Sequence, residues 1–124
     1  MVETDDWAKE GPRVNPKLRN PDTDALFDAI LALRNRDECY AFFEDVLTVS
    51  ELQAIVQRWA VARSLDQGQT YEDIARATGA SSATISRVKR ALMFGADGYR
   101  MVLDRLRNSS REAEGTPTAA APPE

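Results

Sequence analysis

Histidine is absent from this chain, and cysteine occurs once, as Cys39. A single cysteine cannot form an internal disulfide, and in an apolar helical pattern it is usually a small core residue. Without histidine, neither a zinc site nor a cysteine–histidine nucleophile is expected. No paired carboxylates and no glycine-rich phosphate loop stand out either. We therefore predict that the chain is not an enzyme and that it carries no metal or cofactor.

Long apolar runs are also missing, since no stretch approaches the roughly 18 apolar residues that cross a membrane. The first residues are acidic and lack an apolar segment, so they do not resemble a secretory signal. From these absences we expect a cytoplasmic protein that does not enter a membrane.

Proline does not occur in residues 22–108, where glycine is also sparse. Few residues in this range would end a strand or form a hairpin turn, so the range favours an all-α domain. By contrast, residues 1–21 hold three of the six prolines, and residues 109–124 are rich in Ser, Thr, Ala and Pro. We expect a flexible N-terminal arm over 1–21, one helical domain over 22–108 and a disordered tail over 109–124.

Within the domain, apolar residues recur at helical spacing and predict six helices. Their expected N-caps, in chain order, are Asp22 or Thr23, Asp37, Thr48 or Ser50, Thr70, and Ser81 or Ser82, with the last helix after Gly95–Tyr99. The third helix has the broadest apolar face (Leu52, Ile55, Val56, Trp59, Ala62, Leu65) and should lie at the centre. The last helix should turn its apolar stripe inward (Tyr99, Val102, Leu103, Leu106).

The net charge of −4 hides an uneven distribution. Residues Asp22 to Asp73 include 4 basic and 11 acidic side chains, whereas Arg76 to Arg111 include 8 basic and 2 acidic ones. An anionic partner should therefore meet the C-terminal half, and non-specific adhesion should be weak. The alternative is a solvated scatter of charges with no partner.

The segment "YEDIARATGASSATISRVKRAL" combines two short helical patterns with a glycine-containing turn, which is typical of a helix-turn-helix over about residues 70–93. Apolar residues should clamp the two helices together (Ile74, Ala77, Ile85, Val88). Small residues at the start of the second helix would allow close approach to a major groove, and its basic residues could reach phosphates or guanine edges. The candidate DNA-binding residues are Arg76, Ser81, Ser82, Ala83, Thr84, Ser86, Arg87, Lys89 and Arg90. A plain helical hairpin with a solvated basic face is the alternative.

The wider segment "LTVSELQAIVQRWAVARSLDQGQTYEDIARATGASSATISRVKRAL", together with "ECYAFFEDV", "GADGY" and "VLDRL", resembles the Trp repressor family, most closely its YerC/YecD subgroup. This resemblance implies a six-helix fold, an intertwined homodimer and a repressor that binds a palindromic operator on double-stranded DNA. The short apolar-striped helices independently favour completion by a second chain. A dimer would place two recognition helices roughly 34 Å apart, about one turn of DNA.

The resemblance also implies a possible effector pocket at Thr48, Arg58, Thr84, Arg87, Val88 and Ala91. In the founding member, two arginines hold the indole of tryptophan, and Arg58 and Arg87 match them. However, Val88 stands where that member has glycine, and Ala91 stands where a serine meets the ligand's amino group. Tryptophan is therefore not expected. Another small-molecule anion remains possible, or both arginines pair with carboxylates such as Asp73.

The helix before the turn also departs from the founding member, because Tyr71, Glu72 and Ala75 match positions that touch the DNA backbone there. Glu72 near a phosphate is unfavourable, which gives Arg76, Lys89 and Arg90 more importance. A second hypothesis therefore stays open: a helix-turn-helix module that binds a protein partner without binding an operator.

Overall fold

The computed structural model describes residues 11–114 of the chain, and its regular elements there are all helical. A short 3-10 turn precedes six α-helices: η2 (Pro16–Leu18), α2 (Pro21–Leu31), α3 (Arg36–Val46), α4 (Val49–Asp66), α5 (Tyr71–Thr78), α6 (Ser82–Phe94) and α7 (Gly98–Glu114). The all-α prediction is therefore confirmed over the described range. None of the described helices is both long and apolar enough to span a bilayer.

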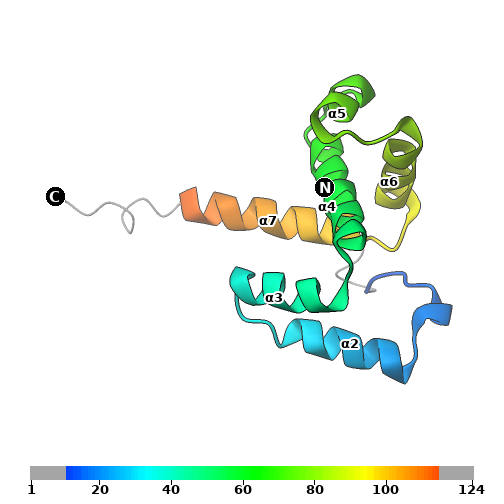
Figure 1. The fold of residues 1–124 in the computed structure, drawn as a ribbon. Helices are drawn as coiled ribbons and strands as arrows, with labels where there is room; N and C mark the ends of the chain where they lie inside the picture. Colours follow the sequence, from blue (N-terminus) through cyan, green and yellow to red (C-terminus); the bar gives the residue numbers. More distant parts are fainter. Residues whose placement is uncertain (1–10, 115–124) are drawn as a thin grey trace.

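Helix α4 lies at the centre of the arrangement, as its apolar pattern predicts, and it packs against α3, α5, α6 and α7. Figure 1 shows α5 and α6 at one end of α4 and the α2–α3 pair at the other, with α7 crossing between them. The helix-turn-helix thus forms a head that projects from the rest of the chain.

The buried core lies where α4, α5 and α6 meet. Its members are Val61, Ala62, Ile74, Ala80, Ile85 and Val88. The prediction that Ala77 faces this core is wrong, because Ala77 is exposed. Helix α5 ends at Thr78, and the left-handed turn at Gly79 (φ 73°) brings Ala80 beneath the helix instead.

Side-chain caps explain where the central helices begin. Thr48 caps α4 in a reciprocal box: its hydroxyl accepts from the Glu51 N–H (3.1 Å), and the Glu51 carboxylate accepts from the Thr48 N–H (2.9 Å). Thr70 caps α5 by accepting from the Asp73 N–H (3.1 Å). The return bond expected from Asp73 is not formed, because that carboxylate pairs with Arg76.

Asparagines cap the first two α-helices, in place of the expected Asp22 or Thr23 and Asp37. The Asn20 side chain accepts from the Thr23 N–H at 2.8 Å, and the Asn35 side chain accepts from the Glu38 N–H at 2.9 Å. Pro21 occupies the first position of α2, where its missing N–H costs nothing. The acidic residues that were expected as caps instead lie in the first turn, where the helix dipole favours them.

Many large apolar side chains are uncovered in the single chain. Leu106 of α7 is 54% exposed and Val56 of α4 is 57% exposed, although both were expected to face inward. Other exposed apolar side chains are Leu31, Tyr40, Val46, Val49, Ile55, Met93, Phe94 and Val102. Monomeric proteins rarely leave this much apolar surface in water. The stripes predicted to face inward are therefore only partly covered by the chain's own helices.

The boundary expected at residue 109 falls inside α7, which continues to Glu114. Residues 11–20 include the η2 turn, which the sequence pattern did not predict. The remainder of the expected arm and tail, residues 1–10 and 115–124, lies outside the described range.

Four charged side chains join the end of α4 to α7. Asp66 accepts from Arg100 (2.8 Å) and Arg107 (2.7 Å), and both arginines also reach Asp104. Burial acts to raise the pKa of Asp66, but the hydrogen bonds from Arg100 and Arg107 outweigh it and leave the pKa below its ordinary value of 3.8. The ionised carboxylate is therefore favoured by folding.

This network predicts a pH-dependent loss of stability. Because the pKa of Asp66 is lowered in the folded chain, its contribution is present above about pH 4 and is lost as the pH falls through the lowered pKa. Asp66→Asn should reduce the free energy of unfolding by about 1 kcal/mol at pH 7. In urea titrations, the difference in free energy of unfolding between Asp66→Asn and wild type should become smaller as the pH is lowered toward about 3. Asp45→Asn, an exposed control on α3, should show neither effect, and a difference independent of pH would contradict this account.

Candidate nucleic-acid interface

The turn between α5 and α6 is held rigidly by hydrogen bonds. Gly79 takes a left-handed conformation (φ 73°) that favours glycine, and its N–H donates to the Ala75 carbonyl at 2.9 Å. The Thr78 hydroxyl donates to the Ile74 carbonyl (2.7 Å) and accepts from the Ala80 N–H (3.1 Å). Gln57 of α4 donates to the Thr78 carbonyl at 3.2 Å. These bonds fix the position of α5 and α6 on the central helix.

Helix α6 begins at a serine cap. The Ser81 hydroxyl accepts from the Thr84 N–H at 3.1 Å, and the two hydroxyl oxygens lie 3.2 Å apart. Ser82 therefore becomes the first helical residue, which settles the choice left open between the two serines. The first turn of α6 carries small, exposed side chains (Ser82, Ala83) and no acidic residue.

Helix α6 has one buried face and one exposed face. Each residue turns a helix by about 100°, so Ile85, Val88 and Leu92 share one face. Ile85 and Val88 are completely or almost completely buried in the core. The opposite face carries exposed side chains: Ala83, Ser86, Arg87 and Arg90. The candidate DNA-binding residues of α6 are thus mostly brought together on its outer side.

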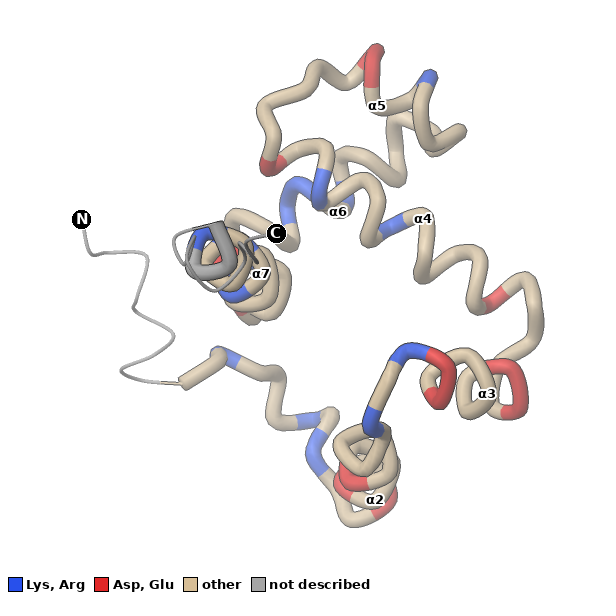
Figure 2. Tube along the Cα trace, turned by 90° about the vertical axis from the view of Figure 1, so that its left-hand side faces the viewer, with Lys and Arg blue, Asp and Glu red and all other residues tan. Residues whose placement is uncertain are grey.

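The basic side chains around α6 differ in their surroundings. Arg87 and Arg90 are exposed and form no ion pair with any residue in the range 11–114. Lys89 points to a flank, where its ammonium lies 5.6 Å from the centre of the Tyr71 ring. Arg76 of α5 pairs with Asp73, so its charge is partly neutralised. Figure 2 shows basic positions along α6, whereas acidic positions are prominent on α2 and α3.

The candidate effector residues are not gathered into one site within the single chain. Val88 is a core residue at 1% exposure, packed in the cluster with Val61 and Ile85. Thr48 caps the start of α4, and the helical rise places Arg58 roughly 15 Å further along the axis. Thr48 instead borders a groove of about 300 Å³ between α3 and α4.

Helical periodicity places Thr84, Arg87 and Ala91 on the flank of α6 that faces away from Lys89. Thr84 and Ala91 are half-buried there and Arg87 is exposed, while Arg58 on α4 is half-buried. The alternative pairing of Arg58 and Arg87 with carboxylates such as Asp73 is not formed among residues 11–114, where Asp73 pairs with Arg76 and neither of the other two arginines has an ion pair.

Residues 22–107 match the family model described as the Trp repressor protein, which covers more than half of the chain. The chain belongs to the Trp repressor family. The resemblance carried by the motifs from α3 to α7 is thereby confirmed, and membership of this family points to a DNA-binding regulator.

Relatives within the Trp repressor family agree with this placement. The chain is 50% identical over 97 residues to the uncharacterized protein YerC of Bacillus subtilis (strain 168), covering 78% of this chain and 93% of YerC. The crystal structure of a TrpR-like protein from Eubacterium eligens ATCC 27750 superposes with a TM-score of 0.72 at 52% identity, covering 74% of this chain and 95% of that one. The crystal structure of a protein from Staphylococcus aureus that is described as a Trp repressor superposes with a TM-score of 0.71 at 56% identity. The match covers 73% of this chain and 91% of that one.

Proposed function

We propose that this chain is a sequence-specific DNA-binding transcriptional regulator, a repressor, and that α6 is its recognition helix. The observation that carries the proposal is the division of α6 into two faces. Ile85 and Val88 anchor the helix in the core, while Arg87 and Arg90 are exposed on the other side without an ion-pair partner among the described residues. An exposed pair of unpaired arginines one helical turn apart suits phosphate or guanine contacts.

The start of α6 fits the same use. Ser82 and Ala83 are small, so the helix end can approach the floor of a major groove without a bulky side chain in the way. The N-terminal end of the helix dipole attracts phosphate. Arg76 and Lys89 lie on the flanks and would add backbone contacts once their present partners, Asp73 and Tyr71, are exchanged for phosphates. Since the target would be chromosomal DNA, the proposal includes a cytoplasmic location.

The experiment that tests this function measures affinity for a selected DNA site at increasing salt. Phosphate contacts release counterions, so the affinity of an operator-binding protein should fall about a hundredfold or more between 50 and 200 mM salt. A module that binds a protein partner, and not an operator, should show no tight DNA complex at low salt. Binding to that partner would depend weakly on salt.

The functional unit in this proposal is a homodimer. The uncovered apolar stripes of α4 and α7 support it, since a second copy would remove them from water and would place two recognition helices on successive half-sites. Sedimentation at micromolar concentration should therefore give twice the chain mass of 13.8 kDa.

A matched pair of variants makes the dimer test specific. Leu106→Gln removes an exposed apolar side chain of α7 and should shift the equilibrium toward the monomer, whereas Asn108→Gln on the same helix should not. A wild-type protein that sediments as a folded monomer at micromolar concentration would refute the dimer.

We further propose that operator binding needs no tryptophan. In the single chain Val88 fills the space between α6 and the core, so the spacing that a ligand could adjust is already occupied by a side chain. A ligand shifts a conformational equilibrium only through different affinities for the two states. Because Val88 already holds the distance between α6 and the core, tryptophan should have nearly the same affinity for both states and should not shift the equilibrium between them.

A further inference from the structure

The segment Gly11–Asn20 precedes the family-matched residues 22–107, yet it reaches the far end of the recognition helix. Arg13 makes a forked contact with Asp97. Its Nε donates to Oδ2 at 3.2 Å, and its Nη2 donates to Oδ2 at 3.0 Å and to Oδ1 at 3.3 Å. The Asp97 side chain is only 17% exposed, so this carboxylate is well shielded from water. A forked arginine–carboxylate contact also fixes orientation.

Asp97 belongs to the turn that joins α6 to α7, and this turn is tightly constrained. Asp97 has a left-handed backbone (φ 71°) that is uncommon for a residue with a side chain, and its carbonyl accepts from the Met101 N–H at 2.9 Å. Gly95 packs so closely on α6 that an added Cβ would lie 2.4 Å from the Ala91 carbonyl oxygen. The orientation of α6 relative to α7 therefore depends on a few residues with little freedom.

We propose that residues 11–20 act as a strap, and that Arg13 is a positioning residue for DNA binding because it locks the α6–α7 turn. The proposal rests on the function assigned to α6. By holding Asp97, Arg13 fixes the end of the recognition helix that lies away from the DNA, and so sets its angle to the rest of the molecule.

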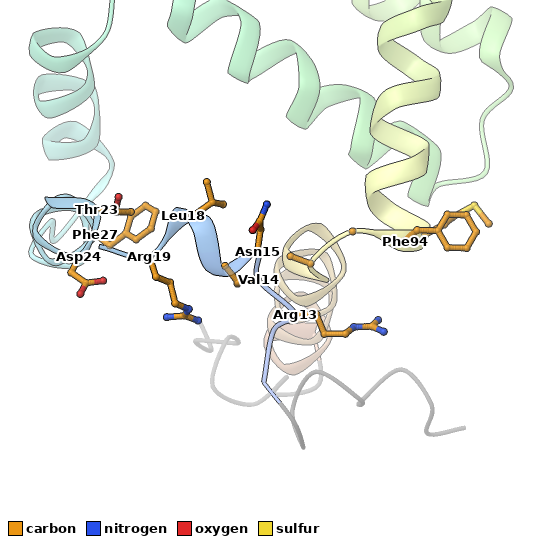
Figure 3. Close-up of a pocket in the computed structure, with 12 residues that line it drawn as sticks. Arg13, Val14, Asn15, Leu18, Arg19, Thr23, Asp24, Phe27 and Phe94 are labelled. Carbon is orange, nitrogen blue, oxygen red and sulfur yellow. The ribbon is translucent and has the colours of Figure 1, made fainter. Parts of the chain in front are cut away.

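The strap has the local rigidity that this role needs. The Asn15 side chain accepts from the Lys17 N–H at 2.9 Å and organises the η2 turn, and Asn20 caps α2. The strap is therefore anchored at one end to the α6–α7 turn, through Arg13, and at the other end to α2, through Asn20. Figure 3 shows the strap passing beside the start of α7, with Phe94 on the other side of that helix; Val14, Leu18 and Phe94 all line the cavity there.

An open cavity of about 1000 Å³ separates part of the strap from the end of α6. The ion pair between Arg13 and Asp97 couples the strap to the α6–α7 turn at the edge of this cavity. The position also separates Arg13 from the proposed DNA surface, because the 13 residues of α6 span roughly 20 Å. Arg13 thus acts on DNA binding through Asp97 and not by touching phosphate.

The test compares Arg13→Ala, Asp97→Asn and the double variant in the full chain. Asparagine tolerates the left-handed backbone, so Asp97→Asn removes the ion pair and keeps the turn. Each single variant should lose about threefold to fivefold in operator affinity, and the double variant should lose no more than either single one. The slope of log affinity against log salt should not change. Arg19→Ala, another exposed arginine of the strap, is the control and should leave affinity unchanged.

Hydrogen exchange in the free protein provides a readout that needs no DNA. Amides of residues 95–101 should exchange at least threefold faster in both single variants and at the wild-type rate in Arg19→Ala. Unchanged exchange in these variants would overturn the strap. A salt slope reduced by about one in Arg13→Ala alone would also overturn it, since Arg13 would then contact phosphate. If wild type binds no DNA while exchange still rises, the strap stands and the proposed function fails.

Discussion

Replacing Arg90 by alanine should weaken operator binding by about thirtyfold or more while leaving the fold intact. The side chain is exposed on the outer face of α6, opposite Ile85 and Val88, and it pairs with no carboxylate of the described structure. A guanine or phosphate contact is worth about 1–3 kcal/mol, and a dimer would lose it twice. Because no buried contact is removed, the free energy of unfolding should stay within about 0.5 kcal/mol of wild type.

A matched control separates a lost DNA contact from a changed net charge. Arg34→Ala alters the charge equally but lies between α2 and α3, away from the head. Its operator affinity should remain within about twofold of wild type. If Arg90→Ala instead unfolded at a much lower temperature, Arg90 would be structural, and equal losses in both variants would indicate a general charge effect.

Val88→Gly should strongly destabilise the head. Val88 is 1% exposed and belongs to the core cluster. Removing its side chain loses about 2–3 kcal/mol of burial and packing, and glycine inside a helix costs about 1 kcal/mol more. The free energy of unfolding should fall by about 3 kcal/mol or more, a large part of the total stability of a small domain.

The stability of Val88→Gly would show whether Val88 is a core residue or a side chain that covers a ligand-binding slot. Because Val88 stands where the founding member of the family has glycine, Val88→Gly would open a slot for the indole if the valine merely covered one. The described structure instead predicts a cavity in the core and a destabilised head. Ala91→Ser, at a half-buried neighbouring site, should cost less than about 1 kcal/mol.

Calorimetry with millimolar tryptophan completes this test. Neither wild type nor Ala91→Ser should give saturable heat. A normal stability for Val88→Gly together with a tenfold tightening of DNA binding by tryptophan would show that the ligand slot exists.

The sequence predicted the helices well because local signals specify them. The Thr48 box, the Gly79 turn and the apolar spacing of Ile74, Ile85 and Val88 each act within a few residues. The family resemblance added the arrangement of these helices in space. The cap could not be chosen where several candidate residues lie close together. Asn20 and Asn35 cap their helices because each side-chain oxygen accepts from a free backbone N–H three residues further along the chain.

Contacts between distant segments could not be predicted in this way. Arg13 and Asp97 lie 84 positions apart, and the bond from Gln57 to Thr78 spans 21, so no local pattern marks either pair. The pairing of Asp73 with Arg76, one turn away on the same helix, was also not among the alternatives that the sequence suggested for Asp73. Exposure of Val56 and Leu106 was missed because an apolar stripe does not say whether its own chain or a second copy covers it.

Selection of bound sequences from a random pool of double-stranded DNA tests the central claim most directly. The account predicts enrichment of a palindromic site whose half-sites lie about one helical turn apart, without any added small molecule. Arg90→Ala should lose this enrichment, and Arg34→Ala should retain it. A pool that stays unenriched after repeated rounds with folded, dimeric protein would contradict operator binding and favour a module that binds another protein.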